Sequence, residues 1–163
     1  MKKYSALLLL PLIVSLSSYA LATNDPNMLR MVTCESSWLD WKQNPAMVEQ
    51  FRNQLRTDFR ADGSDGSYLP IAPTELLGLK VSRVYPQSVG MGLGYSVLVD
   101  AGFKAVRSAL AKQVGKPFES CQKDEGMNSC ELGIGPRKTI MLTEASAGKN
   151  PQTLVGCYYY YEK

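Results

Sequence analysis

The fold that we expect for this chain depends on one stretch, Leu154-Val155-Gly156-Cys157-Tyr158-Tyr159-Tyr160-Tyr161. β-Branched and aromatic residues fit a pleated, half-buried surface, and the Asn150-Pro151 turn signal marks where the run starts. Successive side chains of a strand point to opposite faces, so this run places aromatic rings on both faces of its sheet. We therefore predict a closing β-strand in a sheet that is covered, at least in part, on both sides.

The first 22 residues have the order of a signal peptide. Lys2 and Lys3 precede an apolar run over 6–14, and a small-x-small triplet at 20–22 precedes polar residues. The apolar run is shorter than the roughly 20 residues that a membrane-spanning helix needs. We expect cleavage after Ala22, a periplasmic or secreted protein without a membrane anchor, and a single domain over 23–163. The alternative for this segment is an ordinary buried N-terminal helix.

The predicted mature part contains 141 of the 163 residues, which is the length of one domain with one core. Two of the 18 basic residues lie in the predicted signal peptide, so 16 basic residues remain against 15 acidic ones. This balance gives no electrostatic reason to expect nucleic acid or an acidic membrane surface as a partner.

All four cysteines lie in the predicted exported part, where an oxidising compartment favours disulfides. Four cysteines allow three connectivities, and the sequence alone leaves all three open. We predict the pair Cys121 and Cys130, which closes a short polar loop, and the pair Cys34 and Cys157, which ties the N-terminal region to the last strand. The alternative is a metal site, but the chain has no histidine and no paired Cys-x-x-Cys knuckles. We expect no metal and no cofactor.

Hydrophobic periodicity predicts two main helices. Asn44 is a good N-cap before Pro45, and apolar residues at three- and four-residue spacing extend this helix to about Arg60. Asp100 is placed to cap a second helix, which Gly115 ends. The segment 27–34 remains open between a short helix and a short strand.

Alternation predicts strands over 79–85, 90–99, 130–134 and 137–143, in addition to the closing strand. The Asp- and Gly-rich segment 62–67 is interpreted as a plain turn and 121–130 as a polar loop. The order α-β-β-α-β-β-β predicts an α+β domain. It has a mostly antiparallel sheet of about five strands, packed by two main helices and braced by disulfides.

The absence of histidine excludes Ser-His-Asp triads, Cys-His nucleophile pairs and His-based zinc hydrolases. One remaining alternative is a hydrolase that uses two carboxylates, with the candidates Asp124, Glu125 and Glu131. Another alternative is a binder of a small apolar ligand or of cell-wall material, in a concavity lined by Tyr95, Phe103 and Tyr158.

Recognition of another protein without catalysis is the function that we expect. A loop held by a disulfide, together with tyrosines, supplies contact area that loses little entropy on binding. In being small, exported and disulfide-bonded, the chain resembles periplasmic inhibitors and immunity proteins. This general resemblance implies a protein partner in the cell envelope. The candidate partner-binding residues are Lys123, Asp124, Glu125, Met127, Tyr158 and Tyr160.

Overall fold

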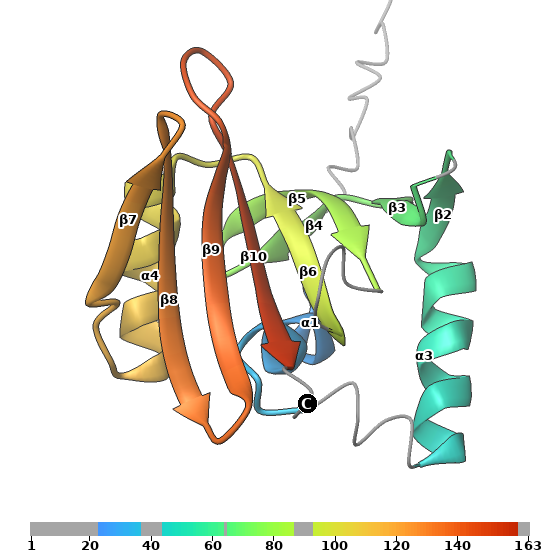
Figure 1. Cartoon of the computed structure of the whole chain (residues 1–163). Helices are drawn as coiled ribbons and strands as arrows, with labels where there is room; N and C mark the ends of the chain where they lie inside the picture. Colours follow the sequence, from blue (N-terminus) through green and yellow to red (C-terminus); the bar gives the residue numbers. More distant parts are fainter. Residues whose placement is uncertain (1–22, 37–43, 64, 87–92, 160–163) are drawn as a thin grey trace, which may run out of the picture.

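The computed structural model describes residues 23–36, 44–63, 65–86 and 93–159. The predicted signal peptide and the residues from Tyr160 onward lie outside these ranges. Within them the chain is an α+β domain with three helices, two disulfides and ten strands (Figure 1). The predicted fold class is confirmed, but the sheet is larger than the five strands that we expected.

The helices are α1 (Pro26–Val32), α3 (Pro45–Thr57) and α4 (Phe103–Val114). The first half of the chain contributes the strands β1 (Thr23–Asn24), β2 (Phe59–Asp62), β3 (Ser67–Pro70), β4 (Thr74–Leu76) and β5 (Leu79–Tyr85). The second half contributes β6 (Leu93–Val99), β7 (Ser120–Asp124), β8 (Met127–Gly135), β9 (Lys138–Ser146) and β10 (Gln152–Tyr159).

The last strand of the chain lies in the middle of the sheet. The strand order is β1-β4-β5-β6-β10-β9-β8-β7, with β3 pairing β5 and β2 pairing β3 off this path. Nine strands pair antiparallel, and β1 pairs parallel with β4. Because β10 pairs with β6 and β9, the tyrosine-rich run holds the two halves of the sheet together.

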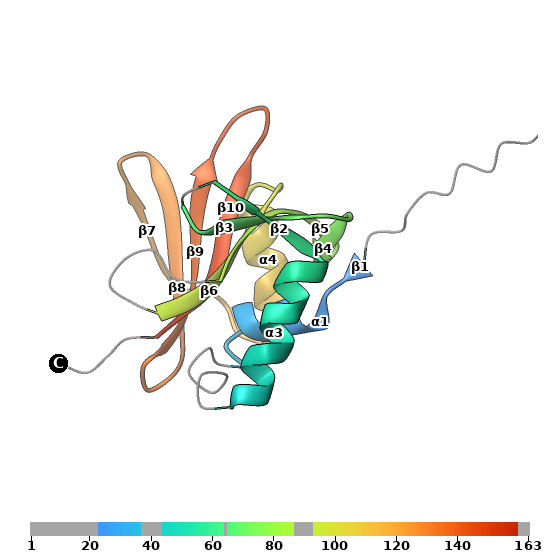
Figure 2. The same ribbon diagram turned by 90° about the vertical axis from the view of Figure 1, so that its right-hand side faces the viewer.

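The helices cover one face of the sheet. Figure 2 shows α1 and α4 on one side of the strands β8 to β10, with no helix of the described residues on the other side. Side chains of β10 alternate accordingly, so Val155, Cys157 and Tyr159 are buried whereas Tyr158 is half-buried. Tyr158 lies beside Gly94 on the open face. The described helices therefore cover one face, whereas we expected the sheet to be covered, at least in part, on both.

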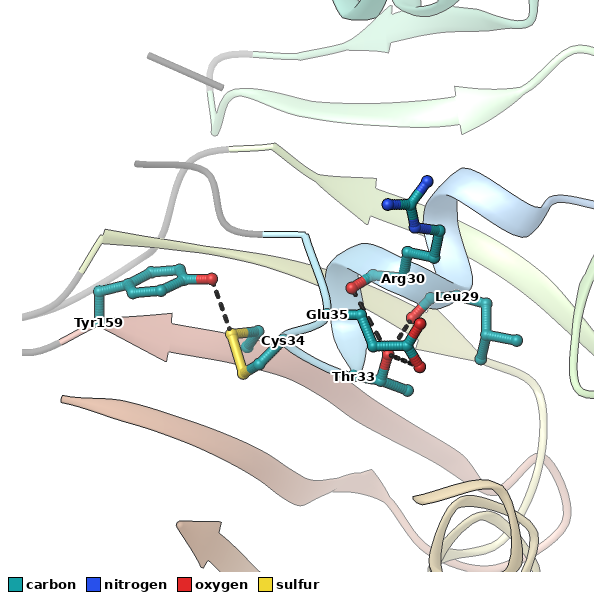
Figure 3. Close-up of a disulfide and its surroundings, with 7 residues drawn as sticks. Leu29, Arg30, Thr33, Cys34, Glu35 and Tyr159 are labelled. Carbon is teal, nitrogen blue, oxygen red and sulfur yellow. Dashed lines mark hydrogen bonds between the residues drawn. A yellow bond between two sulfur atoms is a disulfide. The ribbon is translucent and has the colours of Figure 1, made fainter. Parts of the chain in front are cut away.

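The Cys34–Cys157 disulfide joins the end of α1 to the central strand, as predicted (Figure 3). The two Cα atoms are 5.3 Å apart, and the cysteines are 3% and 1% exposed. The hydroxyl of Tyr159 donates a hydrogen bond to Cys157 Sγ at 3.2 Å. At the end of α1, Thr33 Oγ1 donates to the carbonyl oxygen of Leu29 at 2.9 Å. The disulfide is therefore part of the core.

The segment 27–34, for which the sequence allows either a helix or a strand, contributes most of the helix α1. Asp25 is its N-cap, and one carboxylate oxygen accepts from the amides of Asn27 and Met28 at 2.9 and 3.2 Å. Pro26 occupies the first helical position, where its missing amide costs nothing. The cap and the proline together explain why a helix forms here.

The region after α3 differs from the prediction. The helix ends at Thr57, and Phe59 begins β2 instead of continuing the helical stripe to Arg60. β2 and β3 pair as a hairpin around the predicted turn. Hydrogen bonds from the hydroxyl and the amide of Ser67 stabilise this turn and hold the pKa of Asp65 below its usual range.

Asp100 does not cap α4, contrary to the prediction. The N-cap is Gly102, which makes no side-chain hydrogen bond. The Asp100 carboxylate instead accepts from Lys80 Nζ and Gln152 Nε2, each at 2.8 Å. Burial alone would raise the pKa of Asp100, but these hydrogen bonds outweigh it and lower the pKa. Asp100 therefore links three neighbouring strands, β5, β6 and β10, near one end of each strand.

Removal of each disulfide by paired Cys→Ala substitution is expected to destabilise the fold unequally. In the chain-entropy model, loss of the Cys34–Cys157 link, with a sequence separation of 123, costs about 5 kcal/mol. Loss of the Cys121–Cys130 link, with a separation of 9, costs about 3 kcal/mol. Urea unfolding measures both free energies. An equal or larger loss for the shorter loop would contradict this ranking.

Candidate functional site

The candidate functional site is the hairpin at the end of the sheet. We call residues 120–130 the β7 hairpin; they comprise β7, the turn Glu125-Gly126 and the start of β8. Our prediction of a polar loop is wrong for most of this segment, because its two arms pair as strands. Glu125 and Gly126 have φ values of 48° and 88°, and positive φ at both turn residues is what a two-residue type I′ hairpin requires.

The predicted Cys121–Cys130 disulfide is confirmed and crosses the hairpin between directly opposed residues. Cys130 is 1% exposed and belongs to the core, whereas every residue of β7 is exposed. The disulfide therefore ties the exposed strand β7 to a buried position of β8.

Two further contacts fix the hairpin. Near its tip, the amide and the side-chain nitrogen of Asn128 both donate to Glu144 Oε2, at 3.1 and 2.6 Å. Before its base, Phe118 is 1% exposed, and its carbonyl oxygen accepts from Arg107 Nη2 at 2.6 Å. The hairpin is thus held by Phe118 before its base, by the disulfide near its base and by Asn128 near its tip.

β7 forms one end of the sheet. It pairs with β8, and no other strand of the described ranges pairs with it (Figure 1). A strand in this position presents backbone amides and carbonyls on its outer side.

A groove lies on each side of β7. The larger, of about 520 Å³, separates the hairpin from the first turns of α4. Its polar lining includes Lys104, Arg107, Gln122, Asn128 and Glu144. The smaller groove, of about 230 Å³, lies on the open face and is lined by Ser120, Cys121, Gln122, Ser129 and Glu131.

The structure brings four of the predicted partner-binding residues together. Lys123 and Asp124 end β7, Glu125 lies in the turn, and Met127 begins β8. All four are exposed, and Met127 has an exposed fraction of 46%.

The two predicted tyrosines are not part of this group. Tyr158 lies opposite Thr139, which in turn lies opposite Gly133 on β8. Gly133 is six residues from Met127, a distance of about 20 Å along the strand. Tyr160 lies outside the described residues.

The residues proposed for an apolar ligand do not line one cavity. Tyr95 is buried on the covered face, where its ring meets that of Phe51 edge-on with centroids 6.0 Å apart. Burial raises the pKa of the Tyr95 hydroxyl, and the nearby charge of Asp25 raises it further. Phe103 is also buried, whereas Tyr158 lies on the opposite face of the sheet.

The candidate carboxylates Asp124 and Glu131 are well separated along the hairpin. Asp124 and Glu131 lie four residues apart along the hairpin ladder, which corresponds to about 13 Å. Two-carboxylate glycosidases need about 5–9.5 Å. Glu125 is exposed in the turn.

Within the described ranges, no three or more His, Cys, Asp or Glu side chains form a group that could hold a metal ion. None of the helices described is long and apolar enough to span a bilayer.

Sequence reasoning missed three side chains of the larger groove. Lys104 and Arg107 are polar positions of the amphipathic helix α4, and helical periodicity does not distinguish a groove-lining position from a solvated one. Glu144 follows the buried residues Ile140 and Leu142 at two-residue spacing, so it lies on the core-facing side of its strand. A polar residue at the end of such an apolar stripe is the sequence signal that could have identified it.

Comparisons with protein-family models, curated proteins and solved structures find no match to this chain. We therefore infer function from the geometry of the β7 hairpin and its grooves.

Substitution of Gly126 by Ala is expected to destabilise the hairpin by about 1–2 kcal/mol, because an L-residue pays this cost in the left-handed region. The cost is conformational, since nothing lies within 4 Å of the added Cβ. Gly133→Ala is the matched control, because Gly133 also has open space around it but no positive φ. Urea unfolding and amide exchange of the hairpin measure the effect. Equal costs for the two variants would contradict the turn assignment.

Proposed function

We propose that this chain is an exported protein-binding module that engages another protein of the cell envelope through the β7 hairpin, without catalysis. The observation that carries the proposal is an edge strand that is exposed throughout and yet rigidly held. Binding costs less conformational entropy when the contact surface is ordered in advance. A rigidly held edge strand therefore favours binding affinity.

The hairpin tip supports this proposal through its chemistry. Met127 is exposed opposite Asp124 and two residues after Glu125, and methionine is enriched in protein interfaces. An apolar side chain surrounded by polar ones has the arrangement of an interface anchor with a polar rim.

The proposed location in the periplasm or outside the cell is supported by the two disulfides, which are typical of oxidising compartments. In such a place, an inhibitor- or immunity-type protein would act by covering a surface of its partner. The apolar-ligand alternative has less support, because Tyr95 and Tyr158 lie on opposite faces of the sheet.

Affinity capture tests the proposal. The oxidised protein over residues 23–163 is immobilised and exposed to a cell-envelope extract of the source organism, and bound proteins are identified by mass spectrometry. We expect Met127→Asp to reduce recovery of the specific partner about tenfold, as for an interface hot spot.

Ile71→Asp is the matched control for this experiment. Ile71 is the other exposed large hydrophobic residue of the described part, with an exposed fraction of 60%, and it follows β3 at the far side of the sheet. This variant should capture the partner as the wild type does. Absence of any specific partner, or equal recovery by Met127→Asp, would overturn the proposal.

A further inference from the structure

We propose that the β7 hairpin binds an extended acidic peptide segment, which adds to the sheet as a strand alongside β7. The segment belongs to the protein partner, so the proposal rests on the proposed function and specifies its chemistry. Addition of a strand to a free sheet edge gains affinity from backbone hydrogen bonds and specificity from pockets for alternate side chains.

The backbone geometry identifies the groups that are available. The Cα atoms of Cys121 and Cys130 are 4.1 Å apart, which is the spacing of a pair without mutual backbone hydrogen bonds. The N–H and C=O of Cys121 therefore point away from β8. Pair types alternate along an antiparallel ladder, so the same holds for Lys123, which lies opposite Asn128.

Lys123 is the main docking position on this edge. The amide of Cys121 already donates to the carbonyl oxygen of Glu119 at 3.1 Å. The N–H and C=O of Lys123 and the C=O of Cys121 face outward, and no strand of the described residues pairs with them. A residue placed opposite Lys123 in an added antiparallel strand can exchange both backbone hydrogen bonds with it.

The two grooves can receive the side chains of such a strand. An added strand points alternate side chains to opposite faces of the sheet. One set would enter the groove of about 520 Å³ beside α4, and the other set would enter the groove of about 230 Å³ on the open face. The alternate side chains of an added strand therefore have a groove on each face of the sheet.

Charge favours acidic side chains on the α4 side. Lys104 and Arg107 line that groove, and Lys123 shares a face with Cys121, which also lines it. Among the described residues, no carboxylate forms an ion pair with these three cations. The groove carboxylate, Glu144, is engaged by two donors of Asn128. An acid at every second position of the peptide therefore matches this face.

The same charge disfavours a second copy of this chain as the occupant. In a pair of antiparallel β7 strands joined through the same backbone groups, Lys123 of each copy would lie opposite Cys121 of the other. The two Lys123 side chains would then be diagonal neighbours on one face, at about 7–8 Å. Like charges so placed repel, and edge lysines are a known barrier to self-pairing.

A peptide with glutamate at alternate positions is the probe: acetyl-Thr-Glu-Val-Glu-Val-Glu-Thr-amide with a fluorescent label. Fluorescence anisotropy at low salt should show saturable binding to the oxidised protein, and replacement of Glu by Lys should weaken it at least tenfold.

Two methylated peptides separate strand addition from simple charge attraction. One glutamate lies opposite Lys123, and the other two share its orientation at two-residue spacing. The glutamate amides therefore point toward β7, and the valine amides point to solvent. N-methylation of the glutamate amides should weaken binding at least tenfold, whereas N-methylation of the valine amides should change it less than threefold.

Variants of Lys123 provide the matching test on the protein. Lys123→Pro removes an outward amide and leaves the ladder to β8 intact, which an edge strand tolerates. It should weaken peptide binding at least tenfold, whereas Lys123→Ala, which keeps the amide and loses one charge, should weaken it two- to fivefold. If circular dichroism shows that Lys123→Pro does not fold, the two methylated peptides, measured with the wild-type protein, test strand addition.

Three results would overturn the proposal: no saturable binding of the glutamate peptide, equal binding of the two methylated peptides, or a wild-type dimer in sedimentation that Lys123→Pro makes monomeric. The last result would identify a second copy as the occupant. Partner capture that still depends on Met127 would show that the hairpin binds its partner in another way, so the proposed function would survive the loss of this inference.

Discussion

The Cys34–Cys157 disulfide is the constraint on which the rest of the structure depends. It fixes the end of α1 against β10, and β10 is the strand that connects the two halves of the sheet. Both cysteines are buried, and the hydroxyl of Tyr159 donates to Cys157 Sγ. A crosslink between segments 123 residues apart removes much of the freedom of the unfolded chain. The sheet is therefore most firmly held at its centre.

Order extends from this centre to an edge that has no covering strand in the described part of the chain. β7 is anchored by a second disulfide, by Asn128 against Glu144 and by the buried ring of Phe118, yet its own residues are exposed. A flexible edge would serve a binding function less well, since ordering on binding reduces affinity. A rigid and incompletely paired edge between two grooves connects the fold to the proposed binding function.

Features set by local sequence were predictable. The Asn44-Pro45 cap and the alternation around Tyr95 are confirmed. The two predicted disulfides are also confirmed, although the Cys34–Cys157 link joins residues 123 apart and no local pattern specifies it. Other features depend on partners distant in sequence or on competing patterns. Phe59 fits a helical period as well as a strand, and pairing with β3 decides between them. β7 is exposed throughout, so its strand conformation comes from the turn and from pairing with β8 rather than from burial.

The candidate site also contains residues that local sequence identifies and residues that only the tertiary structure brings together. The four hairpin residues were predictable from a disulfide that bounds a short polar segment. Lys104, Arg107 and Glu144 come together beside the hairpin only because the sheet packs on α4, which no local pattern specifies. Tyr158 does not lie beside these residues, because strand register places it about 20 Å from the hairpin tip.

Residue-specific hydrogen exchange of the oxidised protein tests the central claim most directly, namely that a firmly held centre supports an unpartnered edge. The account predicts that the amide of Val155 in β10 is among the slowest to exchange, while the amide of Lys123 exchanges at close to the rate of an unprotected peptide. Strong protection of Lys123 in the free protein, comparable to that of Val155, would contradict it.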